Sequence, residues 1–159
     1  MPRRRLPAAR PYHARLPVRF SEIDRAGIVY YPRFFHYFHI AFEEFFADRV
    51  GVPYHVMIDE RRIGFPTVHV ACDYRSPLAF GDMLRIEVSV ARVGSSSVDF
   101  RYRIRRGRSA AVAAEALVTV VCVDMDTFRP MPVPKRYRAV FLRNLDGAAA
   151  APGMRARRR

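Results

Sequence analysis

The chain has 159 residues, enough for one domain of ordinary size that buries its own core without structural metals or disulfides. Half of its residues are hydrophobic and 13% are aromatic, which is typical of a packed globule and excludes a wholly disordered chain. No apolar run approaches the roughly 20 residues that span a bilayer, and no apolar stretch like that of a secretory signal follows the N-terminal arginines. We therefore expect a cytoplasmic protein with no membrane partner.

The formal net charge of +13 invites a nucleic-acid interpretation, but most of this charge lies at the two ends. Residues 1–15 contain five Arg and no acid, and residues 145–159 contain four Arg and one Asp. Pro, Ala and Gly surround these arginines, a composition that does not bury enough surface to order itself. We expect basic mobile tails at 1–12 and 144–159 around a domain at 13–143, with no specific nucleic-acid partner. A nonspecific hold on polyanions is the alternative.

The first half of the domain predicts one strand and one long helix. Residues 12–20 alternate loosely and indicate a strand, and Asp24 to Gly27 suit a turn with Asp first and Gly fourth. Pro32 fits the first turn of a helix that runs to about Val50, before Gly51 and Pro53 stop it. This helix is apolar almost all round, so it should be enclosed by other structure.

The second half has a period of two, which indicates strands at 65–75, 84–90, 98–105 and 110–123. Short turns between them favour an antiparallel meander, with a short closing helix at 134–142. Arg101, Arg103 and Arg105 alternate with apolar residues and predict a solvated outer face. Cys72 and Cys122 have no paired spacing, so buried reduced thiols are expected. The fold class is α+β, a long helix wrapped by an antiparallel sheet of about five strands.

One carboxylate, Asp24, stands just upstream of the predicted helix start. Backbone amides in the first turn of a helix have no partner within the helix and can bind an oxygen that gains negative charge. A carbonyl held between these amides and Asp24 would be set up for attack, which points to acyl chemistry. The alternative is that Asp24 only forms the turn.

The stretch from Asp24 to Pro32 resembles the signature of the 4-hydroxybenzoyl-CoA thioesterase family, which has the hot-dog fold. The resemblance covers roughly residues 14 to 140 and includes Ile63–Thr67 and a predicted hairpin at Ser76–Asp82. It implies hydrolysis of an aryl- or acyl-CoA to free acid and CoA. It further implies Asp24 as nucleophile or general base, the Tyr31 amide at the carbonyl oxygen, and Gly27 as the small residue that permits close approach.

The remaining candidates concern the substrate. His39 occupies the helical position where hydroxybenzoyl-specific members of the family resemble one another in carrying a carboxylate. The sequence therefore does not identify the acyl group of the substrate. The residues expected to bind the acyl group are His39, Glu43, Phe65 and Thr67, and those expected near the CoA phosphates are Arg92, Arg129 and Lys135. Glu43 and Glu44 are taken as structural or pocket groups, although other branches of hot-dog thioesterases use a helix Glu in catalysis.

The remaining predictions concern a metal site, two alternative functions and self-association. His36, His39 and Glu43 share roughly one helix face and could be metal ligands, but a contact between His39 and Glu43 explains the spacing, so no metal or redox cofactor is expected. A hot-dog dehydratase or hydratase would need a His base where this chain has Asp24. A nonenzymatic polyanion-binding protein would rely on the arginines. The resemblance implies self-association as a dimer or a dimer of dimers, with sites between subunits.

Overall fold

The computed structural model describes residues 10–147, so the tails predicted at either end lie largely outside the described residues. The elements in chain order are β1 (Tyr12–Pro17), the 3-10 turn η1 (Phe20–Glu22), α1 (Arg33–Phe45), the π turn η2 (Phe46–Val50), α2 (Tyr54–Asp59), β2 (Ile63–Gly64), β3 (Thr67–Tyr74), β4 (Met83–Val93), β5 (Ser97–Arg106), β6 (Val112–Val121), β7 (Val123–Asp124) and α3 (Lys135–Arg143).

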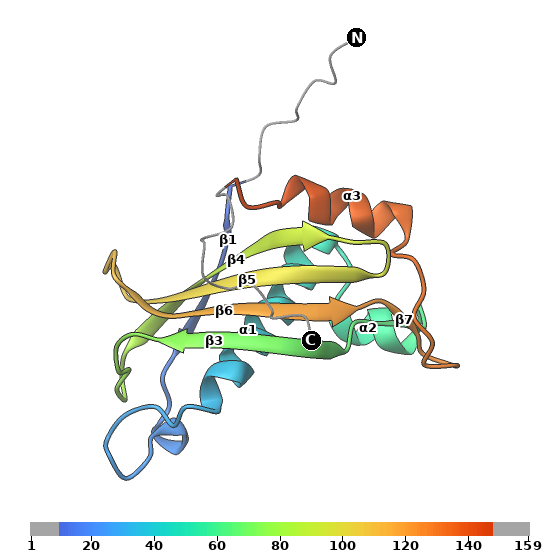
Figure 1. The fold of residues 1–159 in the computed structure, drawn as a ribbon. Coiled ribbons are helices and arrows are strands. Elements are labelled where there is room, and N and C mark those ends of the chain that lie inside the picture. Colours follow the sequence, from blue (N-terminus) through green and yellow to red (C-terminus); the bar gives the residue numbers. More distant parts are fainter. Residues whose placement is uncertain (1–9, 148–159) are drawn as a thin grey trace, which may run out of the picture.

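Five of these strands form one antiparallel sheet in the order β1-β4-β5-β6-β3, and β2 pairs with β7 in a small second sheet. Figure 1 shows α1 lying behind the large sheet. Strand residues alternate between the two faces of a sheet, so the apolar positions of β4 and β5 all point to the same side. In β5 these are Val98, Phe100, Tyr102 and Ile104, each 2% exposed or less. The predicted architecture, a long helix against an antiparallel sheet of five strands, is confirmed.

The helix α1 buries its aromatic face against this side of the sheet. Its buried residues are Phe34, Tyr37, Phe38, Ala41, Phe42 and Phe45. Phe42 and Phe45 meet the ring of Phe100 edge-on, with centroids 5.3 and 5.7 Å apart. The helical path continues through η2 and ends where Gly51 adopts a left-handed φ of 75°. The predicted end of the helix, at about Val50 with Gly51 as the stop signal, is therefore confirmed.

One predicted connection is wrong. The segment Ser76–Asp82 is no hairpin, because β3 pairs with β6 at the edge of the sheet while β4 lies between β1 and β5. The segment therefore carries the chain past the ends of β5 and β6. The short helix α2 is also additional to the predicted elements, since its six residues are too few to show a helical period.

The outer face of the sheet is an ion-pair network and not the solvated row predicted from the alternating arginines. Arg103 contacts the carboxylates of Glu87 at 2.9 Å and Glu115 at 3.2 Å. Arg101 is buried, 9% exposed, and lies 3.9 Å from Glu115 and 3.7 Å from Asp146. Glu87 and Glu115 come from the strands that flank β5, and Asp146 comes from the segment after α3, so these acids neutralise the arginines.

Neither thiol is paired in the described structure. Cys122 is buried as predicted, and burial raises its pKa to about 11, whereas Cys72 on the edge strand β3 is only half-buried. Among the helices of residues 10–147, none combines the length and the apolar character needed to cross a bilayer.

Replacing Phe100 by Ala should lower the free energy of unfolding by about 3–5 kcal/mol, because the ring is fully buried between two elements and its removal leaves a cavity. Urea unfolding followed by circular dichroism measures this change. Phe20→Ala is the control: its ring is 79% exposed and packs edge-on against the ring of Phe80, so the loss should stay below about 1 kcal/mol. Equal losses in both variants would contradict this description of the core.

Replacing Glu115 by Gln should lower the free energy of unfolding by about 1–3 kcal/mol, since the change removes a largely buried charge that serves Arg75, Arg101 and Arg103. Asp126→Asn is the matched control. Its ion pair with Arg62 is exposed on both sides, so the loss should be at most about 1 kcal/mol. Denaturant unfolding in low and high salt compares the two variants, and a Glu115 effect that vanishes in salt would show that the network is merely a surface feature.

Candidate active site

The site begins with a tight loop that ends at the start of α1. The N–H of Gly27 donates to the carbonyl of Asp24 at 3.0 Å, and the N–H of Asp24 donates to the carbonyl of Ile28 at 2.9 Å. Ile23 and Val29 close the loop with an isolated antiparallel bridge. Gly27 has a φ of 79°, in the left-handed region that favours glycine. The predicted turn from Asp24 to Gly27 is confirmed.

The Asp24 side chain is half-buried, and one of its two carboxylate oxygens is hydrogen-bonded within this loop. Its Oδ1 accepts a hydrogen bond from the N–H of Ala26 at 2.8 Å, while no described residue bonds to Oδ2 or forms an ion pair with the group. A carboxylate oriented by one amide, with its other oxygen free, can act as a nucleophile or accept a proton from water. The turn therefore positions Asp24 without neutralising it.

Only one backbone amide near the start of α1 is free of hydrogen bonds. The sequence predicted that all the first-turn amides would be free, and this prediction is wrong for three of them. The N–H groups of Arg33, Phe34 and Phe35 donate to the carbonyls three residues earlier, at 2.8–3.2 Å. Pro32 has no N–H, so among the described residues at this start only Tyr31 offers an unbonded amide. A single donor therefore remains at the helix start, and it belongs to the residue that the family resemblance predicts.

An apolar cavity of about 400 Å³ adjoins this loop. It is lined by Ile28, Val29, Tyr31, Phe34, Tyr74, Arg75, Ser76, Pro77 and Leu78. The Tyr74 hydroxyl donates to the carbonyl of Tyr31 at 3.3 Å, and the Val29 N–H donates to the carbonyl of Leu78 at 2.8 Å. These bonds tie the loop to the edge strand β3 and to the segment after it. Burial raises the pKa of Tyr74 to about 12, so its phenol stays protonated.

A second cavity, of about 230 Å³, lies further along α1 between the helix and the sheet. It is lined by Phe35, Phe38, His39, Phe42, Phe65, Thr67, Val70, Tyr102, Val118 and Val120. Phe35, His39, Thr67 and Val70 are exposed and form its mouth, whereas the other residues are buried and form its floor. The structure thus gathers three of the four residues predicted to bind the acyl group around one cavity.

The fourth, Glu43, lies beside this cavity as the partner of His39. His39 Nε2 is 3.0 Å from Glu43 Oε1, one helical turn away, which agrees with the contact proposed in place of a metal. Within residues 10–147, no three His, Cys, Asp or Glu side chains are grouped so that they could hold a metal ion.

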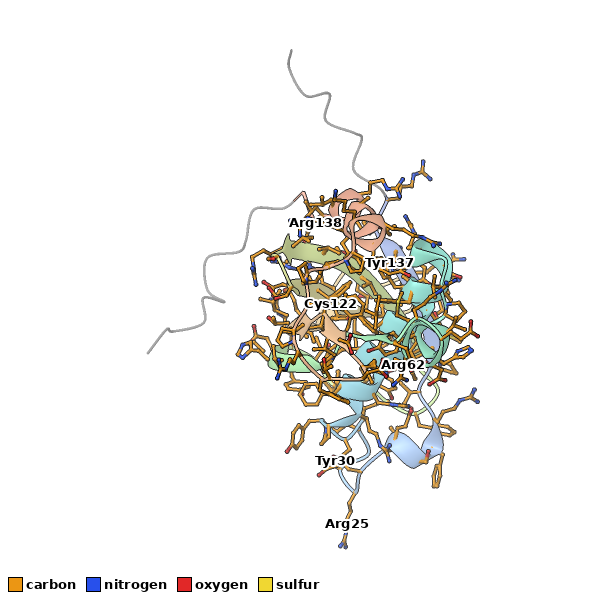
Figure 2. All side chains as sticks on the ribbon, turned by 90° about the vertical axis from the view of Figure 1, so that its right-hand side faces the viewer. Arg25, Tyr30, Arg62, Cys122, Tyr137 and Arg138 are labelled. Atoms are coloured by element: carbon orange, nitrogen blue, oxygen red, sulfur yellow. The ribbon has the colours of Figure 1, made fainter. Side chains whose placement is uncertain are left out.

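The residues predicted near the CoA phosphates lie at the other end of the sheet. Arg92 ends β4, and its Nε binds Asp99 at 2.7 Å, so this cation already has a partner. Arg129 and Lys135 flank Val133, which bonds to Ser95 beyond the end of β4. The Asp24 loop packs near the start of β4, and eleven strand residues span roughly 30 Å. Figure 2 shows the same separation, with Arg25 and Tyr30 at one extremity and α3, carrying Tyr137 and Arg138, near the other.

Two aromatic residues of these cavities were missed by the sequence predictions. Tyr74 ends the edge strand and Tyr102 lies at the middle of β5. The period-two pattern places Tyr102 on the inward face, but a pattern of apolar positions does not distinguish a core residue from one that borders a cavity.

Comparisons with known proteins identify the family of this chain. Residues 18–144 match the family model described as the thioesterase-like superfamily. The acyl-CoA thioesterase YbgC of Haemophilus influenzae is 28% identical over 127 residues, covering 79% of this chain and 91% of that protein. A 1,4-dihydroxy-2-naphthoyl-CoA hydrolase of Prochlorococcus marinus is 30% identical over 132 residues, covering 77% and 82%.

Among solved structures, BH1999 gentisyl-coenzyme A thioesterase superposes with a TM-score of 0.71 at 29% identity, over 81% of this chain and 99% of that chain. The matched region contains the Asp24 loop, α1 and every strand from β2 to β7. The chain therefore belongs to the thioesterase-like superfamily and has its hot-dog fold.

Proposed function

We propose that this protein is an acyl-CoA thioesterase that hydrolyses an aryl- or acyl-CoA to the free acid and CoA. The observation that carries the proposal is the pairing, on one loop, of an unneutralised carboxylate at Asp24 with an unbonded amide at Tyr31. The names of the relatives support the thioester class, since each acts on a CoA derivative. They differ in the acyl group, so the 4-hydroxybenzoyl substrate of the resembling family is one candidate among several.

The chemistry needs a group that delivers oxygen to the thioester carbonyl and a donor that stabilises the oxygen's negative charge. Asp24 either adds to the carbonyl itself, forming an anhydride that water then cleaves, or takes a proton from the attacking water. The Tyr31 N–H donates to the carbonyl oxygen as charge develops on it. The carbon–sulfur bond breaks and CoA leaves as the thiolate. In the general-base route Asp24 passes the proton taken from water to this sulfur, and in the nucleophilic route the water that cleaves the anhydride supplies it and regenerates the Asp24 carboxylate as the acid leaves. In this scheme Gly27 allows the turn its left-handed backbone and leaves open space beside the loop.

The acyl group is proposed to enter the cavity of about 230 Å³ beyond Phe34, past His39 and Thr67 at the mouth and against Phe65 on the floor. Glu43 holds the His39 ring at this mouth. Hydroxybenzoyl-specific relatives carry a carboxylate at this position. The imidazole of His39 cannot replace that carboxylate as an anionic partner for a substrate phenol. The cavity near Tyr31 and Tyr74 is left for the thiol arm of CoA.

A second copy of the chain would complete the site. The edge strand β3 has no partner on its outer side within the described residues and exposes Val68, which is 60% accessible. An unpaired apolar edge favours strand addition. If two copies pair antiparallel through β3, opposite ends of the two sheets come together. Arg129 and Lys135 of a second copy then approach the Asp24 loop, where CoA phosphates need cations.

Asp24→Asn should lower kcat by about 10²–10⁴-fold, because the amide can neither attack the carbonyl nor accept a proton. Thiol release from short, long and aromatic acyl-CoAs, monitored with a thiol reagent, measures the loss. Asp59→Asn, an exposed aspartate on α2, is the matched control and should keep wild-type turnover. Near-normal turnover in Asp24→Asn together with loss in Glu43→Gln or Glu44→Gln would transfer the role to the helix.

Val68→Lys should convert a dimer to a monomer, since a charge on the exposed edge of β3 opposes strand pairing. Size-exclusion chromatography with light scattering gives the mass, and thiol release from the same preparation should fall with dimer content. Leu142→Lys on α3, 45% exposed, is the control for adding a charge to an exposed apolar site. A wild-type protein that is monomeric yet fully active would refute the shared site.

A further inference from the structure

The floor of the acyl cavity contains one polar group with nothing to bind. Tyr102 lines this cavity and is 2% exposed, and its hydroxyl forms no hydrogen bond with any described residue. Its ring packs on Phe38 and Phe100, with centroids 5.2 and 6.4 Å away. Two buried tyrosines away from this cavity pair their hydroxyls: the hydroxyl of Tyr12 donates to Asp48, and that of Tyr37 donates to Glu22, each at 2.7 Å. A buried hydroxyl without a partner is costly and calls for a reason.

The hydroxyl of Tyr102 meets the open volume and is not sealed in the core. Within the described residues, the unpartnered buried polar atoms that are closed off from solvent comprise only Arg85 Nε. The Tyr102 oxygen is therefore reached through the cavity that its side chain lines. Burial alone raises the pKa of Tyr102, so the group is a neutral phenol that can donate one hydrogen bond.

Water is a poor permanent partner at this depth. A buried water molecule is held well where it finds two to four polar partners, but the floor around Tyr102 consists of Phe38, Phe42, Phe65, Val118 and Val120. The polar side chains His39 and Thr67 lie at the exposed mouth. A ligand oxygen that replaces such a loosely held water gains affinity.

The cavity volume limits what can carry that oxygen. A cavity of roughly 150 Å³ lined by apolar side chains accepts benzene, and a water-sized group needs about 30 Å³. The volume of about 230 Å³ therefore holds one aromatic ring with a few substituent atoms. The lining offers no cation at the floor, so an anionic substituent would be desolvated without compensation.

We propose that Tyr102 is the specificity-determining residue of the acyl cavity: its hydroxyl donates a hydrogen bond to a neutral ring oxygen, such as a phenol, on an aromatic acyl group. This inference rests on the proposed thioesterase function and names the substrate class of the same site. A site built around an unpaired donor favours the oxygenated ring over its plain analogue, because the analogue leaves the donor unpaired.

The test compares benzoyl-CoA with 2-, 3- and 4-hydroxybenzoyl-CoA in the wild type and in Tyr102→Phe. The wild type should prefer at least one hydroxylated isomer by about tenfold in kcat/KM, and Tyr102→Phe should reduce that preference by about three- to tenfold. The rate with benzoyl-CoA should hold or rise. A preference that is absent in the wild type, or equal in both proteins, overturns the inference.

The control separates specificity from folding. Tyr12→Phe removes a paired hydroxyl on β1, away from both cavities, so it should lower the melting temperature and leave the isomer preference unchanged. Tyr102→Phe removes an unpaired hydroxyl and should not lower the melting temperature. A drop as large as that of Tyr12→Phe would show that the Tyr102 hydroxyl is structural, against the inference.

The proposed function can fail independently. If the wild type cleaves none of the short, long and aromatic acyl-CoAs, the thioesterase proposal is wrong. Calorimetric titration of the same four thioesters into the uncleaving protein and into Tyr102→Phe then tests the inference alone. A binding preference for a hydroxylated isomer that Tyr102→Phe abolishes supports it, and equal binding of all four refutes it.

Discussion

The packing of the aromatic face of α1 on the inward face of β5 is the contact on which the rest of this structure depends. Phe42 and Phe45 meet Phe100 edge-on, and Phe38 lies against Tyr102, so the rotation of the helix about its axis is fixed. This rotation places Phe35 and His39 together at the exposed mouth of the cavity, because helix residues three and four apart share a face. The cavity of about 230 Å³, proposed to hold the acyl group, lies between these two residues and the strands β3, β5 and β6.

The same rotation sets the direction in which the chain enters α1. The Asp24 loop precedes the helix by one turn and is fastened to the sheet through Val29 and Leu78. This bond joins the loop to the cavity that starts beside Phe34, because Val29 and Leu78 both line that cavity. The carboxylate of Asp24 and the amide of Tyr31 are held on one loop, because Ile23 bridges to Val29 and the N–H of Phe34 donates to the Tyr31 carbonyl.

Much of this was predictable from residue patterns, and the failures share a cause. The helix from Pro32 to Gly51, the turn at Asp24 and the alternation of β4 and β5 depend on neighbours in sequence, and all were predicted. The place of β3 at the far edge and the neutralised Arg103 depend on contacts between distant segments. Arg103 shows this best: its cross-strand neighbours are Glu87 on β4 and Glu115 on β6, which only the register of three strands identifies.

The Asp24 loop and the cations predicted near the CoA phosphates lie far apart in one chain. The Asp24 loop lies near the start of β4, whereas Arg129 and Lys135 lie roughly a full strand length away. A CoA thioester presents its reacting carbonyl and its phosphates at opposite ends of a long flexible arm, so the proposed site needs cations at a distance from Asp24. An antiparallel pair joined at β3 brings the two ends of different copies together. Under the proposed pairing, the exposed apolar edge and the displaced cations are two consequences of one arrangement, in which a second copy completes the site.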